Sequence, residues 1–191
     1  MPTLYARIPE DRVAVVIGPG GRTKKAIASA TATQVDIDAE EGEISVTGPE
    51  TDPMGVLKAR DIVIAIGRGF SPERAMRLLK ENTFLGVLDI KFATGHREKA
   101  ALRRIRSRVI GTRGRARERI EELSGCSMSV YGSTVALIGE EQQLDRATRA
   151  VEMLVKGSEH STVFHLLARL KRDDAVKEAT SSADEVMDLG G

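Results

Sequence analysis

The strongest constraint on the fold is a short motif that the chain carries twice, 93 residues apart. Each copy is a Val-Ile pair followed by Gly-x-x-Gly and an arginine, at Val16–Arg22 and at Val109–Arg115. An isoleucine follows six residues after the closing glycine in both copies, at Ile27 and Ile120. A single Gly-x-x-Gly is weak evidence because glycine pairs occur in many turns. Two copies in matching flanks indicate an internal duplication.

The correspondence between the copies extends well past the motif. Thr31 corresponds to Ser124 at the same offset, whereas segments 46–48 and 137–139 correspond at an offset of 91. The second copy has therefore lost two residues between its strands. A period near 90 residues is too long for a solenoid repeat and suits two small domains. We predict a first domain at residues 1–80, a second at 87–172, and an acidic tail at 173–191 that is mobile or loosely helical.

Hydrophobic spacing and turn residues predict one element order for both copies: strand, helix, Gly-x-x-Gly, helix, strand, strand, helix. In the first copy we expect strands at 4–8, 34–38 and 43–47, and helices at 10–17, 22–30 and 54–66. In the second we expect strands at 87–92, 127–131 and 134–138, and helices at 98–110, 115–123 and 141–156. Each copy adds a helix, at 72–80 and 162–172, and a link spans 81–86. Ala26, Ile27 and Ala30 are expected to face inward. The fold class is α+β.

The distribution of charge is more informative than the net charge of +1. Between Arg97 and Arg119 the chain has ten basic residues and only two acidic ones, Glu98 and Glu118, which is a formal +8 over 23 residues. A charge run alone is usually a solvated helix face. A basic stripe beside a glycine loop is, however, typical of nucleic-acid binders.

Composition indicates a soluble, cytoplasmic protein without a cofactor. Hydrophobic residues make up 41 % of the chain, yet no apolar run is long enough to span a membrane. The N-terminus lacks the apolar stretch of a signal peptide. Cys126 is the only cysteine, which excludes an internal disulfide and a cysteine-based structural metal site.

The element order and the Val-Ile-Gly-x-x-Gly motif resemble the KH domain of type I topology, in which a three-stranded antiparallel sheet packs on helices. The chain then resembles two such domains, each with an extra C-terminal helix. The second half is further similar to the archaeal KH proteins related to the eukaryotic small-subunit assembly factor "partner of Nob". The segments that carry this similarity are Arg106–Gly111, Ile120-Glu121, Val130–Gly132, Val135–Glu140, Gly157–His160 and Val163-Phe164.

That resemblance implies single-stranded RNA binding near the 3′ end of small-subunit rRNA. It also implies cooperation with a PIN-domain nuclease that trims this end, and a link to the alpha subunit of translation initiation factor two. In the eukaryotic relatives the first repeat lacks a GXXG, so the loop at Gly18–Gly21 is a departure from their pattern.

The chemistry of the loops suits phosphate binding. A Gly-x-x-Gly allows a tight bend with no Cβ to hold a phosphate away, and the next helix presents N–H groups and the positive end of its dipole. Basic residues just beyond each loop can add phosphate contacts. The candidate RNA-binding residues are Gly111, Thr112, Arg113, Gly114, Arg115, Arg117, Arg108 and Ile110 in the second copy, and Gly18, Pro19, Gly20, Gly21, Arg22, Lys24 and Lys25 in the first.

The two loops are not equivalent. Thr112-Arg113 offers a hydroxyl and a guanidinium, whereas Pro19-Gly20 offers neither, and Pro19 also lacks a backbone N–H. We therefore expect the second loop to dominate RNA binding. Apolar residues beside the loops could touch bases or simply belong to the core; they are Ile17, Ile27, Val35, Ile110, Ile120 and Met128.

The sequence lacks the patterns of the enzyme classes that share glycine-rich loops. Gly18–Lys25 has neither the spacing of a P-loop nor the third glycine of a dinucleotide fingerprint. His96, His160 and His165 are isolated in the sequence, and we expect His160 to be a helix-start or packing residue. We therefore expect a binding protein and not an enzyme. Two alternatives remain open: a KH-based protein-interaction scaffold with little RNA affinity, and a KH protein that acts on mRNA or in RNA decay.

Overall fold

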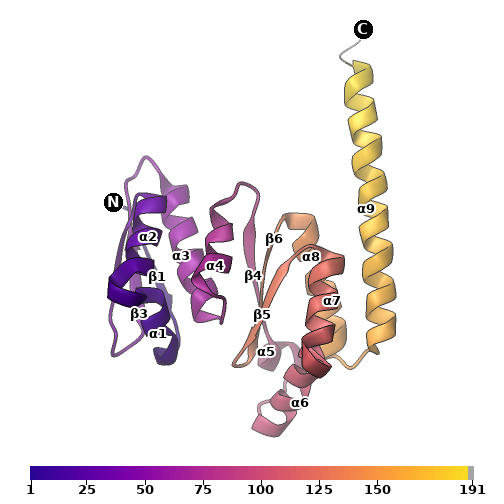
Figure 1. The fold of residues 1–191 in the computed structure, drawn as a ribbon, viewed down its shortest axis with the longest axis horizontal. Coiled ribbons are helices and arrows are strands. Elements are labelled where there is room, and N and C mark those ends of the chain that lie inside the picture. The colour runs from indigo at the N-terminus through magenta and orange to yellow at the C-terminus, as the bar shows by residue number, and fades with distance from the viewer. Residues whose placement is uncertain (189–191) are drawn as a thin grey trace. The chain divides into compact units, whose positions relative to one another are not determined.

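The computed structural model describes the backbone of residues 1–188 and the side chains of residues 1–177, 179 and 180. Each copy contains the predicted elements in the predicted order, and the second copy has one further short helix after its first strand (Figure 1). In the first copy the elements are β1 (Thr3–Arg7), α1 (Glu10–Ile17), α2 (Arg22–Thr31), β2 (Gln34–Ile37), β3 (Glu43–Thr47), α3 (Pro53–Gly67) and α4 (Pro72–Ala75). A 3-10 turn, Met76–Leu79, follows α4.

The second copy repeats this order with one additional short helix, α5, after its first strand. Its elements are β4 (Phe84–Asp89), α5 (Ile90–Thr94), α6 (Lys99–Ile110), α7 (Arg115–Ser124), β5 (Ser127–Tyr131), β6 (Thr134–Gly139), α8 (Glu141–Val155) and α9 (His160–Asp188). Short 3-10 turns at Pro19–Gly21 and Thr112–Gly114 form the two Gly-x-x-Gly loops. In the described residues no helix is both long and apolar enough to cross a membrane.

By internal contacts the chain divides into two compact units. Unit 1 comprises Met1–Asp89 and Ser127–Glu140, and therefore holds the first copy together with the sheet of the second. Unit 2 comprises Ile90–Cys126 and the chain from Glu141 onward, which are the helices of the second copy. The two units are defined by packing, whereas the predicted domains 1–80 and 87–172 were defined by the sequence repeat. The domain bounds therefore stay a prediction.

The sheet of the first copy has the strand order β1-β3-β2, with both pairs antiparallel. The central strand β3 alternates in burial: Ile44 and Val46 are fully buried, and Val46 pairs with Leu4 on one side and with Val35 on the other. Burial of every second residue is expected for a strand in a sheet that packs one face against a core. Helix α3 contributes most to that core, because eight of its fifteen residues are buried.

The sheet of the second copy has the order β4-β6-β5 and shares the core of the first copy. All six residues of β6 are buried. Ala136 and Ile138, which point to the same face of the strand, belong to one apolar cluster with Phe70 and Leu78. The hydroxyl of Ser129 also donates a 3.0 Å hydrogen bond to the carbonyl oxygen of Arg68. Unit 1 is thus one folding body that contains both sheets.

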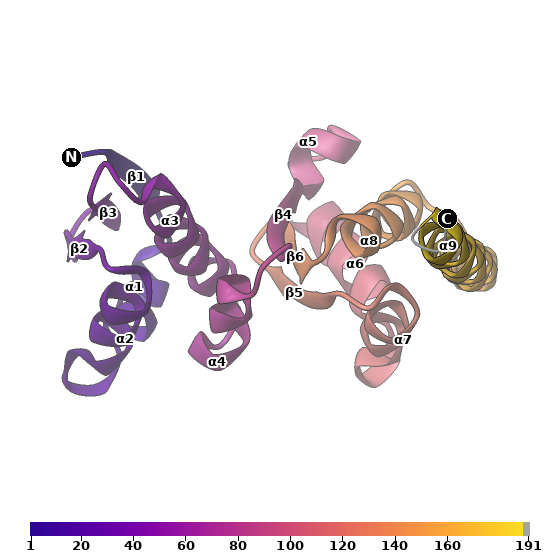
Figure 2. The ribbon, with the colours of Figure 1, turned by 90° about the horizontal axis from the view of Figure 1, so that it is seen from above.

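In unit 2, α8 and α9 lie side by side in both views (Figures 1 and 2). An ion pair joins them, because Arg146 lies 2.7 Å from the carboxylate of Asp174. The Lys171 ammonium donates to the carbonyl oxygen of Glu122 on α7. The expected helix end at Arg172 is wrong, since α9 continues to Asp188. The tail predicted as mobile or loosely helical is therefore helical over residues 173–188, and residues 189–191 lie outside the described part of the chain.

The strand predicted at 87–92 is shifted in the structure. Strand β4 starts at Phe84, within the predicted link 81–86, and ends at Asp89. Its partner β6 begins at Thr134, which pairs with Asp89, so the chain beyond Asp89 has no neighbouring strand to bond to. It turns into α5 instead, where Ile90 is fully buried.

The predicted inward face of the helix after the first loop is partly wrong. Ile27 is fully buried, as expected, but Ala26 and Ala30 are exposed. The buried positions of α2 are Ile27 and Thr31, four residues apart on one face.

Candidate nucleic-acid interface

The two loops have the same backbone conformation. Gly18 and Gly111 begin them with φ/ψ of 71°/170° and 74°/173°, and Gly21 and Gly114 end them at 76°/14° and 81°/3°. Left-handed φ values favour glycine at both ends of each loop, because they place a Cβ in steric conflict with the backbone. The repeated motif therefore encodes a repeated geometry.

The first glycine of each loop is also required by space. An ideal Cβ on Gly18 would lie 2.2 Å from the Thr23 Oγ1, and one on Gly111 would lie 2.6 Å from the Ala116 Cβ. The helix that follows each loop therefore folds back against its first residue. The outer side is open: a Cβ on Gly114 would meet nothing nearer than 3.9 Å, and one on Gly20 would meet nothing within 4 Å. A phosphate has room to approach there.

Some of the backbone N–H groups expected to bind phosphate are already used. The N–H of Gly114 donates to the carbonyl oxygen of Gly111 at 3.2 Å, and the N–H of Arg115 donates to that of Thr112. The first loop closes in the same way, with Gly21 donating to Gly18 at 3.0 Å. These bonds hold the turn rigid, so a ligand depends more on the side chains around it.

The side chains of the second loop are presented to solvent. Thr112, Arg113 and Arg115 are exposed, and within the described part of the chain none of them takes part in an ion pair or a side-chain hydrogen bond. Arg117 lies farther along α7 and is half-buried, with its Nε 3.8 Å from the carboxylate of Glu121. Two guanidinium groups and one hydroxyl are therefore available at the loop itself.

Arg113 occupies an unfavourable backbone region. Its φ/ψ of 55°/26° is left-handed, and the equivalent residue of the first loop, Gly20, has nearly the same values of 59°/25°. A non-glycine residue in this region costs on the order of 1–2 kcal/mol. The turn accepts glycine, so the second copy retains a strained arginine where the fold does not require one.

The first loop has no cation between its two outer glycines, and its basic residues lie on the helix that follows. Arg22 and Lys25 are exposed, but the ammonium of Lys24 lies 3.8 Å from the carboxylate of Asp36 on β2. Gln34 donates to that same carboxylate at 2.7 Å. The carboxylate of Asp36 thus offsets part of the positive charge of the helix after the first loop. Pro19 and Gly20 are exposed but add no polar side-chain group.

The guanidinium of Arg108 is engaged in hydrogen bonds to the backbone. It donates to the carbonyl oxygens of Gly157 and Ser158, which lie in the turn between α8 and α9. The backbone carbonyl of Arg108 also contacts the Nε2 of His160 at 2.8 Å. His160 begins α9, so its predicted role at a helix start is confirmed. Arg108 thus joins three helices of unit 2.

Most of the apolar candidates are core residues. Ile27, Val35, Ile120 and Met128 are at most 1 % exposed, which leaves them no surface for a base. Ile17 and Ile110, each directly before its loop, are half-buried and retain some accessible surface.

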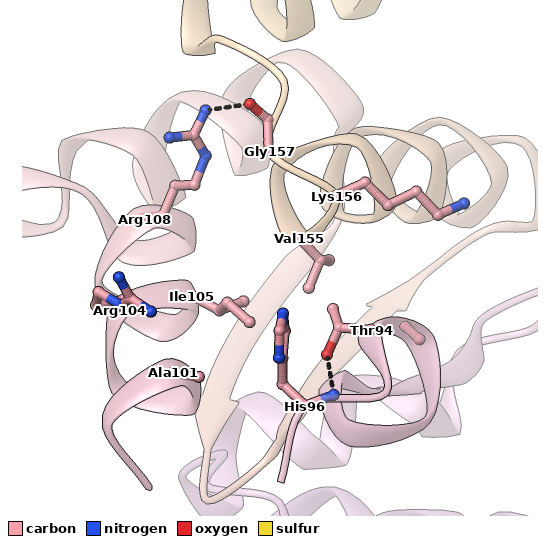
Figure 3. A pocket seen from close by; sticks show the side chains of 10 residues that line it. Thr94, His96, Ala101, Arg104, Ile105, Arg108, Val155, Lys156 and Gly157 are labelled. Carbon is pink, nitrogen blue, oxygen red and sulfur yellow. Dashed lines mark hydrogen bonds between the residues drawn. The ribbon is translucent and has the colours of Figure 1, made fainter. Parts of the chain in front are cut away.

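Unit 2 contains a basic pocket with a volume of about 520 Å³ (Figure 3). The sequence did not lead us to expect it. It is lined by Ala93, Thr94, His96, Ala101, Arg104, Ile105, Arg108, Val155, Lys156 and Gly157. The pattern of α6 could have indicated one wall, because Arg104 and Arg108 lie one turn apart. The other walls come from α5 and the end of α8, and the end of α8 is distant from α6 in sequence. In the described residues no group of three or more His, Cys, Asp and Glu could hold a metal ion.

Two copies of strand, helix, Gly-x-x-Gly, helix, strand, strand, helix define the class of tandem type I KH proteins. The family model described as "KH domain" matches residues 3–65, and the model described as "Eukaryotic type KH-domain (KH-domain type I)" matches residues 85–172.

The chain is similar to several archaeal proteins. It is 43 % identical over 166 residues to a KH domain-containing protein of Methanocaldococcus jannaschii, covering 85 % of this chain and 71 % of the relative. The crystal structure of Dim2p from Pyrococcus horikoshii is 48 % identical with a TM-score of 0.83, covering 88 % of this chain and 99 % of that one. A protein from Aeropyrum pernix is 36 % identical with a TM-score of 0.92, covering 96 % and 98 %. The chain therefore belongs to the archaeal Dim2p family of tandem KH proteins, the archaeal counterparts of "partner of Nob".

A further solved structure is a complex of a/eIF2alpha, aDim2p and rRNA from Pyrococcus horikoshii. It is 49 % identical to this chain with a TM-score of 0.84, and the match covers 90 % of this chain and 95 % of the chain compared.

Proposed function

We propose that this chain binds single-stranded RNA, and small-subunit rRNA in particular, chiefly through the loop Gly111–Gly114. Thr112, Arg113 and Arg115 supply one hydroxyl and two guanidinium groups, all exposed, on a rigid turn whose outer side is open. In KH domains this loop clamps the backbone of about four nucleotides. Guanidinium groups suit phosphate oxygens because their planar donors can bond two oxygens at once.

The left-handed conformation of Arg113 carries the proposal. A strained residue that persists where a glycine would fit is a marker of function, because selection for stability alone would remove it. In the first copy Gly20 adopts the same left-handed conformation without strain, but it brings no charged side chain to the loop. The nearby Lys24 is paired with Asp36. The two loops therefore share a shape but differ in chemistry.

The cellular role we propose is small-subunit biogenesis in the cytoplasm, near the 3′ end of the rRNA. This role is supported by family membership and by the Pyrococcus complex of aDim2p with a/eIF2alpha and rRNA. The same complex supports an initiation factor subunit as a partner of this chain. Cooperation with a PIN-domain nuclease rests on the family resemblance alone. The proposal assigns the chain a binding role and no catalytic step.

Filter binding to a single-stranded oligonucleotide from the 3′ end of small-subunit rRNA, with salt varied, tests the proposal. We expect saturable binding that weakens with salt, since each phosphate contact on a single strand adds about −0.7 to the slope of log K against log salt. Absence of binding at low salt would favour the protein-interaction scaffold. Crosslinking followed by sequencing of the bound RNA separates rRNA from mRNA targets.

A further inference from the structure

We propose that the pocket lined by Arg104, Lys156 and His96 is a second RNA site, which holds a nucleotide flanking the segment clamped at Gly111–Gly114. This inference rests on the proposed function, because it extends the same RNA strand along α6. The pocket and the loop both belong to unit 2.

One face of α6 supplies the wall of the pocket. Ala101, Arg104, Ile105 and Arg108 have the spacing i, i+3, i+4 and i+7, which aligns them in a single stripe. The same helix ends at the Gly111 loop, so Arg104 lies seven residues, or about 10 Å, before it. An RNA strand of a few nucleotides is long enough to reach from the loop to the pocket.

The lining has the chemistry of a nucleotide site. Ala101, Ile105 and Val155 are apolar, and the imidazole of His96 projects between α5 and α6 (Figure 3), where a base could stack on it. Arg104 and Lys156 are exposed and have no ion-pair partner among the described residues. A volume of about 520 Å³ is within the usual range of small-molecule sites.

The charges around the pocket favour an anion. None of the ten lining residues is acidic. The carboxylate of Glu98 lies 4.0 Å from the Nδ1 of His96, and its side chain is 79 % exposed. The Nε of Arg108 is buried and has no hydrogen-bond partner among the described residues, which leaves an unsatisfied donor in the wall. A phosphate bound at Arg104 or at Lys156 would add the missing negative charge.

Two hydrogen bonds of the Thr94 hydroxyl hold the backbone at His96 in position. The hydroxyl of Thr94 donates to the carbonyl oxygen of Ile90 at 2.6 Å, and the N–H of His96 donates to the Thr94 Oγ1 at 3.2 Å (Figure 3). These two bonds fix the turn after α5, so the pocket is formed before a ligand enters. A preformed site orders fewer groups on binding.

RNA length separates this site from the loop. The test compares a tetranucleotide with a long RNA, defined as an oligonucleotide of more than twice that length. Wild-type protein should bind the long RNA more tightly than the tetranucleotide. Arg104→Glu should weaken binding of the long RNA roughly tenfold, because it removes one phosphate contact and adds a repulsion, and should leave tetranucleotide binding unchanged. Arg103→Glu is the matched control, with the same charge change at an exposed neighbour that does not line the pocket.

A fluorescence reporter tests occupancy directly. The chain has no tryptophan, so His96→Trp introduces a single probe. We expect quenching by the long RNA and little change with the tetranucleotide. The proposal is overturned if Arg104→Glu and Arg103→Glu weaken binding of the long RNA equally, or if Arg104→Glu does not change that binding. Either result would overturn the RNA site even if the pocket binds a protein segment instead. Failure of wild-type protein to bind any RNA would instead overturn the proposed function.

Discussion

The hydroxyl of Tyr131 donates a hydrogen bond to the carboxylate of Asp11, although the two residues are 120 positions apart in the chain. The guanidinium of Arg12 lies 5.6 Å from the centre of the same tyrosine ring. Strand β5 of the second copy is thereby attached to helix α1 of the first. These contacts attach the sheet of the second copy to the first copy within unit 1.

The hydrogen bond to Asp11, followed by burial, raises the pKa of Tyr131 above its ordinary value of 10.0. A raised pKa means that folding favours the neutral phenol, so this contribution to stability is complete below pH 10 and is lost as pH rises through the raised pKa. In a Tyr5→Phe background Tyr131 is the only tyrosine. Absorbance at 295 nm should then titrate with a midpoint above 10, and Asp11→Ala should lower it. An unchanged midpoint in Asp11→Ala would show that Asp11 is not the cause.

Ile138 should stabilise the first copy, although it belongs to the second. It is 2 % exposed and lies in the same cluster as Phe70 and Leu78. Ile138→Ala should cost about 2–5 kcal/mol of unfolding free energy and should accelerate hydrogen exchange in α3. Val87→Ala is the control, since Val87 is 45 % exposed and such surface changes usually stay within about 0.5 kcal/mol. Unchanged exchange in α3 would contradict the shared core.

Arg113→Gly should stabilise the fold and weaken RNA binding together. The change relieves a left-handed arginine, and the gain is limited to about 1 kcal/mol because glycine also loses more chain entropy on folding. Thr112 does not have a positive φ, so replacing it with glycine relieves no strain. Thr112→Gly should therefore destabilise the protein, because glycine loses more conformational entropy on folding. Thermal melts and RNA titrations of both variants measure these signs. A loss of stability in Arg113→Gly would remove the argument from strain.

The first and last glycines of the second loop should differ in their tolerance of alanine. Both have positive φ, but only at Gly111 would a Cβ also collide with Ala116, at 2.6 Å. Gly114→Ala should therefore cost about 1–2 kcal/mol for conformation alone, and Gly111→Ala should cost more. Chemical denaturation measures both values, and equal losses would show that the collision is relieved by a small shift of α7.

The repeat, the loops and most element ends could be predicted from the sequence, because turn residues and apolar spacing determine them locally. Gly18 and Gly111 are examples, since each is required by its own φ and by the helix that follows. The shared core could not be predicted, because the cluster that contains both Ile138 and Phe70 depends on packing between distant segments. The role of Arg108 was missed for the same reason: its acceptors, Gly157 and Ser158, are about 50 residues away.

The central claim is that two loops of one shape differ in RNA affinity because of their side chains. The most direct measurement is a titration of single-stranded RNA, at fixed salt, against Thr112→Asp/Arg113→Asp and against Pro19→Asp/Gly20→Asp, with thermal melts to confirm that both variants fold. The account predicts a much larger loss of affinity for the first double variant, since charge reversal at phosphate contacts acts strongly on binding. Equal losses from the two double variants, with both proteins folded, would contradict it.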